Sequence, residues 1–244
     1  MADRYDETRG GEERGRLLAG EIDPLLDRQR PTLEIGVGTG LVALGLRELG
    51  HRVVGVDLSL PMAARAVERL GPVVAVGDAM RLPVADAALD QAVSVWVLHL
   101  VSDQTAVLAE VARTLRPGGR YVVAPGHLAR PEDEMGAMLW DLDRLLDPDD
   151  RRVDDAGRLR SLAPDAGLRV VEERRCAPRR FEMSPEETAR NIEERVYSIL
   201  WDVEDTTWRD LVEPVIRRLR GLADPERPRP RVHEYRLVVL ERPA

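Results

Sequence analysis

Three glycines stand at alternate positions in the first quarter of this 244-residue chain: Gly36, Gly38 and Gly40. An apolar run from Thr32 to Ile35 precedes them, and apolar residues at helical spacing follow over Leu41–Leu49. Glycine is required where a backbone turns sharply or touches a ligand, because no Cβ intervenes. In an open parallel sheet, a strand-to-helix turn lies at the carboxyl edge, where ligands bind. The cluster therefore predicts a ligand-binding turn or a purely structural one.

β-Branched runs alternate with helical patterns through residues 1–126, which predicts right-handed βαβ units on a parallel sheet. After the first strand, further strands are expected over 52–56, 73–76, 89–95 and 120–124. Helices are expected over 12–30, 41–49, 103–115 and from a Ser59 cap to Gly71. The second half predicts helices over 132–146, 155–166, 185–201 and 208–222, and strands over 168–174 and 232–240.

Composition excludes several classes of protein and of chemistry. All 36 basic residues are arginine, which excludes lysine-based catalysis, and Cys176 is the only cysteine, which excludes a disulfide within the chain. The net charge of −8 disfavours a nucleic-acid partner. No apolar run approaches the length of a membrane span, and the charged N-terminus is unlike a signal peptide. We therefore expect a cytoplasmic protein without a membrane partner.

Two carboxylates follow the second and third predicted strands. Asp57 ends the second strand and can accept both hydroxyls of a ribose, whereas Asp78 ends the third and can accept from an adenine amine. Each acid alone is equally well a helix cap or a solvated turn. Both together, at successive strand ends behind a glycine turn, indicate a nucleoside site.

These features resemble the class I S-adenosylmethionine-dependent methyltransferases, particularly their small-molecule branch known as type 11. The motifs that carry the resemblance are 33–40, 53–59, 77–83, 89–99 and 115–120. The match covers about 30–126, while 127–244 match loosely, through Ala166-Gly167-Leu168 and a late strand. The resemblance implies an α/β, doubly wound Rossmann-like sheet of seven strands, the last antiparallel, with a helical lid insertion. It also implies S-adenosyl-L-methionine as cofactor.

The resemblance assigns cofactor-binding roles residue by residue. Gly36 and Gly38 would let the methionine part pass close to the backbone, and Glu34 would lie beneath its ammonium group. The remaining assigned residues would contact the ribose (Asp57), the adenine (Leu58, Asp78, Ala79 and Met80) and the methionine part (Trp96). The N-terminal segment resembles the lid of some small-molecule methyltransferases, with Tyr5 covering the cofactor and Arg9 pairing with its carboxylate; a solvated tail is the alternative.

Methyl transfer is a displacement at an already activated sulfonium, so the protein mainly positions the reactants. His99 and His127 follow the fourth and fifth strands, where an imidazole could accept a proton from the acceptor. For each of them a hydrogen-bonded loop residue is the favoured interpretation. We expect no metal site. His99 is the candidate general base.

The second half is expected to form the acceptor pocket of a single methyltransferase domain over 1–244, with 1–30 as lid and helix, 31–126 as cofactor-binding core and 127–244 as pocket helices and C-terminal strands. Apolar residues at helical spacing suggest a moderately hydrophobic acceptor, although core packing is the favoured interpretation: Met135, Met138, Leu139, Trp140, Tyr197, Leu200, Trp201 and Trp208. A late arginine cluster is read as a solvated face rather than an RNA site.

Three alternatives remain. A nicotinamide dinucleotide fold would need a glycine where Leu41 stands. A cyclase or binding protein could keep the cofactor site without transferring methyl groups. A methyltransferase acting on RNA or protein is disfavoured by the acidic charge. A monomer or homodimer is expected.

Overall fold

The computed structural model describes residues 6, 11–126, 133–149 and 153–244. The chain divides into two compact units. The first comprises residues 1–126, 154–176 and 236–244, and the second comprises 127–153 and 177–235. The second unit is therefore built from two segments that interrupt the first in sequence. Single-domain organisation and a lid function for the inserted helices stay predictions.

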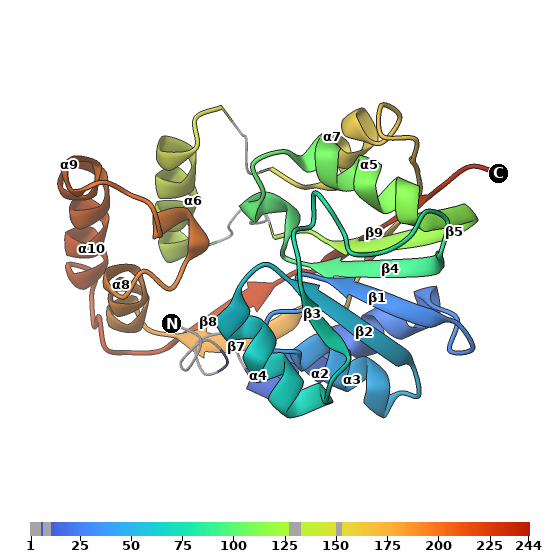
Figure 1. Cartoon of the computed structure of the whole chain (residues 1–244). Helices are drawn as coiled ribbons and strands as arrows, with labels where there is room; N and C mark the ends of the chain where they lie inside the picture. The colour runs from blue at the N-terminus through green and yellow to red at the C-terminus, as the bar shows by residue number, and fades with distance from the viewer. Residues whose placement is uncertain (1–5, 7–10, 127–132, 150–152) are drawn as a thin grey trace. The chain divides into compact units, whose positions relative to one another are not determined.

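The first unit contains a seven-stranded sheet with the order β3-β2-β1-β4-β5-β9-β6 (Figure 1). Strand β9 runs antiparallel to its neighbours β5 and β6, while the other paired strands are parallel. This confirms the doubly wound sheet with one late antiparallel strand. The strands are β1 (Pro31–Ile35), β2 (Arg52–Asp57), β3 (Val74–Val76), β4 (Leu89–Val95), β5 (Leu115–Ala124), β6 (Arg169–Arg175) and β9 (Arg236–Glu241).

The chain order reverses between β1 and β4. From β1 the chain proceeds outward through β2 and β3, then returns to pair β4 on the other side of β1. In open α/β sheets, ligands bind at the carboxyl ends of the strands beside such a reversal. The glycine turn after β1 lies at this point.

Helices cover both faces of the sheet. Figure 1 shows α2, α3 and α4 on one face and α5 and α7 on the other. Between the sheet and the latter pair lies a core that includes Leu98, Leu108, Tyr121 and Leu159, all fully buried. The helices are α2 (Gly11–Ile22), α3 (Leu41–Glu48), α4 (Leu60–Leu70), α5 (Gln104–Thr114) and α7 (Ala156–Leu162).

The expected side-chain cap at Ser59 is wrong. Ser59 occupies the N-cap position of α4 but its side chain accepts no bond from the helix. Its backbone N–H is instead taken by Asp57 Oδ1 at 2.8 Å. The cap of α5 follows the usual chemistry, since Asp103 accepts from the Ala106 N–H.

The second unit is mainly helical and has its own apolar core. It contains α6 (Glu134–Leu146), α8 (Pro185–Glu193), a π-helical turn (Trp208–Val212) and α10 (Glu213–Arg220). Met135, Met138 and Leu200 are buried in this core, so core packing accounts for them. Trp201 donates its indole N–H to the Arg195 carbonyl oxygen at 3.0 Å. An acceptor pocket in this unit stays a prediction.

Two sequence predictions fail in the C-terminal quarter of the chain. The helix expected over 185–201 ends at Glu193, because Arg195 adopts a left-handed backbone (φ 52°) and a short 3-10 helix follows at Ser198–Leu200. The strand expected over 232–240 is two strands, of which β8 (Arg229–His233) pairs antiparallel with β7 (Arg179–Met183).

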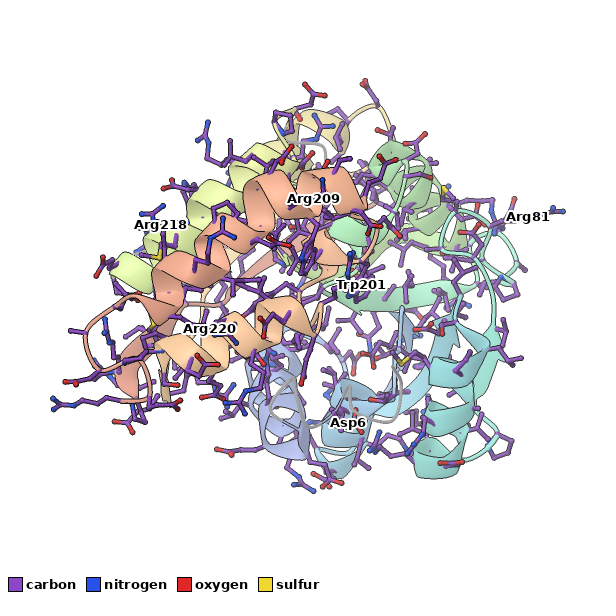
Figure 2. The ribbon with its side chains drawn as sticks, turned by 90° about the vertical axis from the view of Figure 1, so that its left-hand side faces the viewer. Asp6, Arg81, Trp201, Arg209, Arg218 and Arg220 are labelled. Atoms are coloured by element: carbon purple, nitrogen blue, oxygen red, sulfur yellow. The ribbon has the colours of Figure 1, made fainter. Side chains whose placement is uncertain are left out.

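The late arginine cluster is partly neutralised within the second unit. Arg220 makes ion pairs with Glu186 at 2.9 Å and Glu193 at 2.7 Å. Arg231 pairs with Asp133 at 2.9 Å. Arg220 and the exposed Arg218 are labelled in Figure 2. Such pairing fits the solvated face expected from the sequence. Among the described helices, none combines the length and apolar composition that crossing a bilayer requires.

Candidate active site

The turn between β1 and α3 has a backbone that only glycine adopts readily. Gly36, Gly38 and Gly40 have φ values of 68°, 56° and 83°. A Cβ on Gly36 would overlap the side chain of Val97. The Gly36 and Val37 N–H groups both donate to the Val56 carbonyl oxygen, at 2.7 and 3.0 Å. These contacts bring the glycine loop against the end of β2.

Asp57 fastens this loop from the neighbouring strand. Its Oδ2 accepts from the Gly38 N–H at 2.7 Å, and its Oδ1 accepts from Ser59. Each carboxylate oxygen has a second lone pair, so the group keeps accepting capacity toward a ligand. The next residue, Leu58, is 71% exposed. An apolar side chain so exposed at a strand end is a surface on which a flat ring can pack.

Glu34 is a buried acid directly before the loop. Only 2% of its surface is exposed, and Oε2 has no hydrogen-bond partner among the described residues. Burial, reinforced by the nearby charge of Asp57, raises the pKa of Glu34 to about 8, against a lowering by a hydrogen bond from the Ala43 backbone. Such a group favours a cationic or hydrogen-bond-donating ligand beside it.

A small pocket that opens to solvent lies over the loop. Trp96 stands in its wall at the end of β4, with a left-handed backbone (φ 55°). That conformation is strained for a bulky residue and is concentrated at functional sites. The lining of the pocket includes Arg14, Glu34, Gly36, Gly38, Thr39 and Trp96.

Arg14 is a pocket residue that the sequence analysis missed. Its guanidinium carbon lies 3.8 Å from the centroid of the Trp96 ring, a cation–π distance. Arg14 belongs to α2, whose charged first turn reads as a solvated surface. Only the packing of α2 beside the loop distinguishes it from the other arginines.

The residues after β3 form a second group. Asp78 Oδ1 accepts from the Met80 N–H at 2.8 Å, which makes a tight turn. Ala79 and Met80 are half-buried against the core. Asp57 and Val76 are register partners on adjacent parallel strands, so Asp57 and Asp78 share one edge of the sheet. The cofactor-binding residues expected from the sequence therefore fall into two groups. One group lines the pocket, and the other lies at the ends of the neighbouring strands β2 and β3.

Asp6, labelled in Figure 2, contacts the end of the glycine loop and α4. Asp6 accepts from Thr39 Oγ1 at 2.5 Å and forms an ion pair with Arg69 at 2.8 Å. Arg69 also donates to the Thr39 carbonyl oxygen. The expected lid residues Tyr5 and Arg9 lie outside the described residues.

His99 lies on a short 3-10 helix (Leu98–Leu100) after β4. It is absent from the described lining of the pocket over the glycine loop. Its Nδ1 is 3.6 Å from Oδ2 of the fully buried Asp154, a partner that the sequence analysis did not anticipate. His127 lies outside the described residues.

Comparison with known proteins finds similarity over the part of the chain that contains the glycine loop, Asp57 and Asp78. A family model described as a methyltransferase domain matches residues 33–123. Demethylmenaquinone methyltransferase of Mycolicibacterium vanbaalenii is 30% identical over 184 residues, covering 75% of this chain and 72% of the relative.

Two solved structures share the fold. Phosphoethanolamine N-methyltransferase 2 of Haemonchus contortus, in complex with S-adenosyl-L-methionine, is 21% identical with a TM-score of 0.53, over 96% of this chain and 53% of that one. The [4+2]-cyclase SpnF is 19% identical with a TM-score of 0.56, over 94% of this chain and 82% of that one. At these identities the likeness concerns the fold alone.

Proposed function

Because the chain belongs to the class I S-adenosylmethionine-dependent methyltransferases, we propose that it methylates a small-molecule acceptor by in-line displacement. The observation that carries the proposal is the glycine-loop pocket with Glu34 in its wall, whose Oε2 has no hydrogen-bond partner within the described part of the chain. S-adenosylmethionine, when bound, supplies a methyl group on a positively charged sulfonium.

The residues of the first unit fit that cofactor. Glu34 would hold the ammonium group, since a cation beside a buried acid favours its ionised form. The Gly36–Gly38 backbone would lie along the methionine part, and Arg14, in the same pocket, is suited to its carboxylate. At the strand ends, Asp57 would accept from the ribose hydroxyls, and Leu58, Asp78, Ala79 and Met80 would surround the adenine.

In the reaction, the protein would position the cofactor and the acceptor and would exclude water from the site. A sulfonium is already activated, so displacement requires no protein nucleophile. Trp96 would close the pocket beside the reacting centre, where a large ring displaces solvent. The relative from M. vanbaalenii makes a reduced quinone of the demethylmenaquinone type the first acceptor to test.

Calorimetry with S-adenosylmethionine and S-adenosylhomocysteine tests the cofactor site directly. We expect Asp57→Asn to weaken binding at least about tenfold, since about 1.4 kcal/mol is the loss of one charge-assisted hydrogen bond. The matched control is Asp165→Asn, at an exposed position, which should leave affinity unchanged. No heat from the folded wild type with either compound would refute the proposed function.

A second experiment tests the transfer itself. Methyl-labelled cofactor is incubated with the protein and reduced demethylmenaquinone or smaller aromatic acceptors, and S-adenosylhomocysteine is quantified. Acceptor-dependent formation of this product is expected. Binding of the cofactor without product from any small acceptor would contradict the small-molecule assignment.

A further inference from the structure

A buried acid–base pair lies beyond the carboxyl ends of β4 and β5. Asp154 is fully buried, and both of its oxygens accept from the Gly126 N–H, at 3.0 and 3.1 Å. The imidazole of His99 faces it, with Nδ1 buried and 3.6 Å from Asp154 Oδ2. A Cβ on Gly126 would overlap the His99 ring, so a glycine after β5 makes this approach feasible.

Burying a carboxylate is costly unless donors or a cation compensate it. Behind Asp154, the fully buried Tyr121 shares a 2.6 Å hydrogen bond with Ser94. Burial raises the pKa of Tyr121, and the charge of Asp154 raises it further, which keeps the phenol neutral. His99 lies at ion-pair distance from Asp154, so a protonated imidazole can share in compensating the buried carboxylate.

Ring geometry then determines which nitrogen is free to react. With Nδ1 turned toward Asp154, the opposite nitrogen, Nε2, points away from it. His99 keeps 14% exposure. Nδ1 has no hydrogen-bond partner among the described residues, so Asp154 acts on the ring through its charge at 3.6 Å. A negative charge beside one ring nitrogen favours a proton on that nitrogen, here Nδ1, and leaves Nε2 as the base.

We propose that His99 is the general base of the methyl transfer and that Asp154 positions it, which assigns the acceptor to the weakly acidic hydroxyl compounds, phenols or enols. This inference rests on the proposed function and adds the substrate class. In the reaction the acceptor hydroxyl gives its proton to Nε2. The electron pair of the oxygen, or of the conjugated carbon, forms the bond to the methyl carbon, and the carbon–sulfur pair stays on sulfur.

The class of acceptor follows from which acceptors need a general base. A neutral amine attacks with its own lone pair, and a carboxylate is already ionised at neutral pH. A phenol or enol is mostly protonated there and gains most from proton removal in the transition state. Asp154 would stabilise the imidazolium that forms.

Nitrogen-15 spectra of the full-length protein test the pair without turnover. The chain has four histidines, and His99→Gln identifies the signals of one of them. In the wild type we expect the neutral ring of His99 to carry its proton on Nδ1. Asp154→Asn should shift this tautomer toward Nε2, while Asp155→Asn, which alters the cap of α7, should not. An unchanged tautomer in Asp154→Asn would overturn the positioning role.

Turnover tests the base and the acceptor class. With naphthols and reduced demethylmenaquinone, His99→Gln should lower kcat about 100-fold or more and leave the Kd of S-adenosylhomocysteine unchanged. Naphthylamines should be poor acceptors. Equal rates in wild type and His99→Gln, or methylation of amines but not hydroxyl compounds, would overturn the inference while cofactor binding persists. Loss of cofactor binding in the wild type would instead refute the proposed function.

Discussion

At the scale of single residues, Glu34 and the glycines beside it determine the character of the pocket. Glu34 is an acid that the fold buries before any ligand arrives, and Gly36 is a loop position that tolerates no side chain. Burial of Glu34 costs free energy in the unliganded protein, and the crowding at Gly36 penalises any larger residue there. Each therefore has a measurable effect on stability as well as on binding.

Stability should depend on pH through Glu34. Its folded pKa of about 8 lies above its usual value of 4.5, so the folded state binds the extra proton between these values. The free energy of unfolding should therefore fall as pH rises toward 8, by about 1.4 kcal/mol per pH unit at most. Urea denaturation from pH 5 to 8 should show this slope in the wild type and not in Glu34→Gln.

Glu48→Gln provides the control for that series. Glu48 is exposed and paired with Arg16, and this hydrogen bond lowers the pKa of Glu48. It is ionised in both states above pH 5, so its removal should leave the slope intact. Parallel curves for the wild type and Glu34→Gln would show that Glu34 does not titrate in this range.

Comparing Gly36→Ala with Gly38→Ala should separate the cost of backbone strain from the cost of steric overlap between the new methyl group and a neighbouring side chain. Both positions have left-handed backbones, which cost alanine about 1 kcal/mol. At Gly36 the new methyl also meets Val97, whereas at Gly38 nothing lies within 4 Å. We expect thermal unfolding to show a loss of about 3 kcal/mol for Gly36→Ala and about 1 kcal/mol for Gly38→Ala. Equal losses of stability in the two variants would contradict the predicted steric overlap with Val97.

At the scale of elements, the sequence predicts the first unit well because local and global signals agree there. The glycine loop, Asp57 and Asp78 each follow an apolar β-branched run, and the structure places them at one edge of the sheet. Strands β7 and β8 give no such signal, since each is short and has arginine at two of its five positions. Asp154 was missed because its partner His99 is 55 residues away in sequence.

The packing of α2 on α3 depends on small residues. A Cβ on Gly45 would lie 2.7 Å from Ala19 Cβ, whereas one on Gly20, also in α2, would meet nothing within 4 Å. Gly45→Ala should destabilise the protein by about 1–2 kcal/mol and weaken cofactor binding, because α3 begins at the glycine loop. Gly20→Ala should stabilise it by about 0.5–1 kcal/mol. Melting temperatures measure the change in stability of both variants. A change of the same sign in Gly45→Ala and Gly20→Ala would contradict the close packing of α2 on α3.

At the scale of the whole molecule, the candidate cofactor residues belong to one unit. Glu34, Asp57, Asp78 and Trp96 all lie within residues 1–126. The second unit has a separate core, which includes Ile192 and Leu219. We therefore expect cofactor binding to affect the stability of the first unit and to leave that of the second unit unchanged.

Hydrogen exchange measured with and without S-adenosylhomocysteine tests this division. A ligand that binds only the native state slows exchange most where it restrains local opening. We expect added protection at residues 36–40 and 77–80, and none in the core of the second unit at 189–192 and 212–219. In Asp57→Asn the same ligand concentration should protect the first group less. Equal protection in both units would mean that cofactor binding also restrains the inserted helices, so that the two units open together.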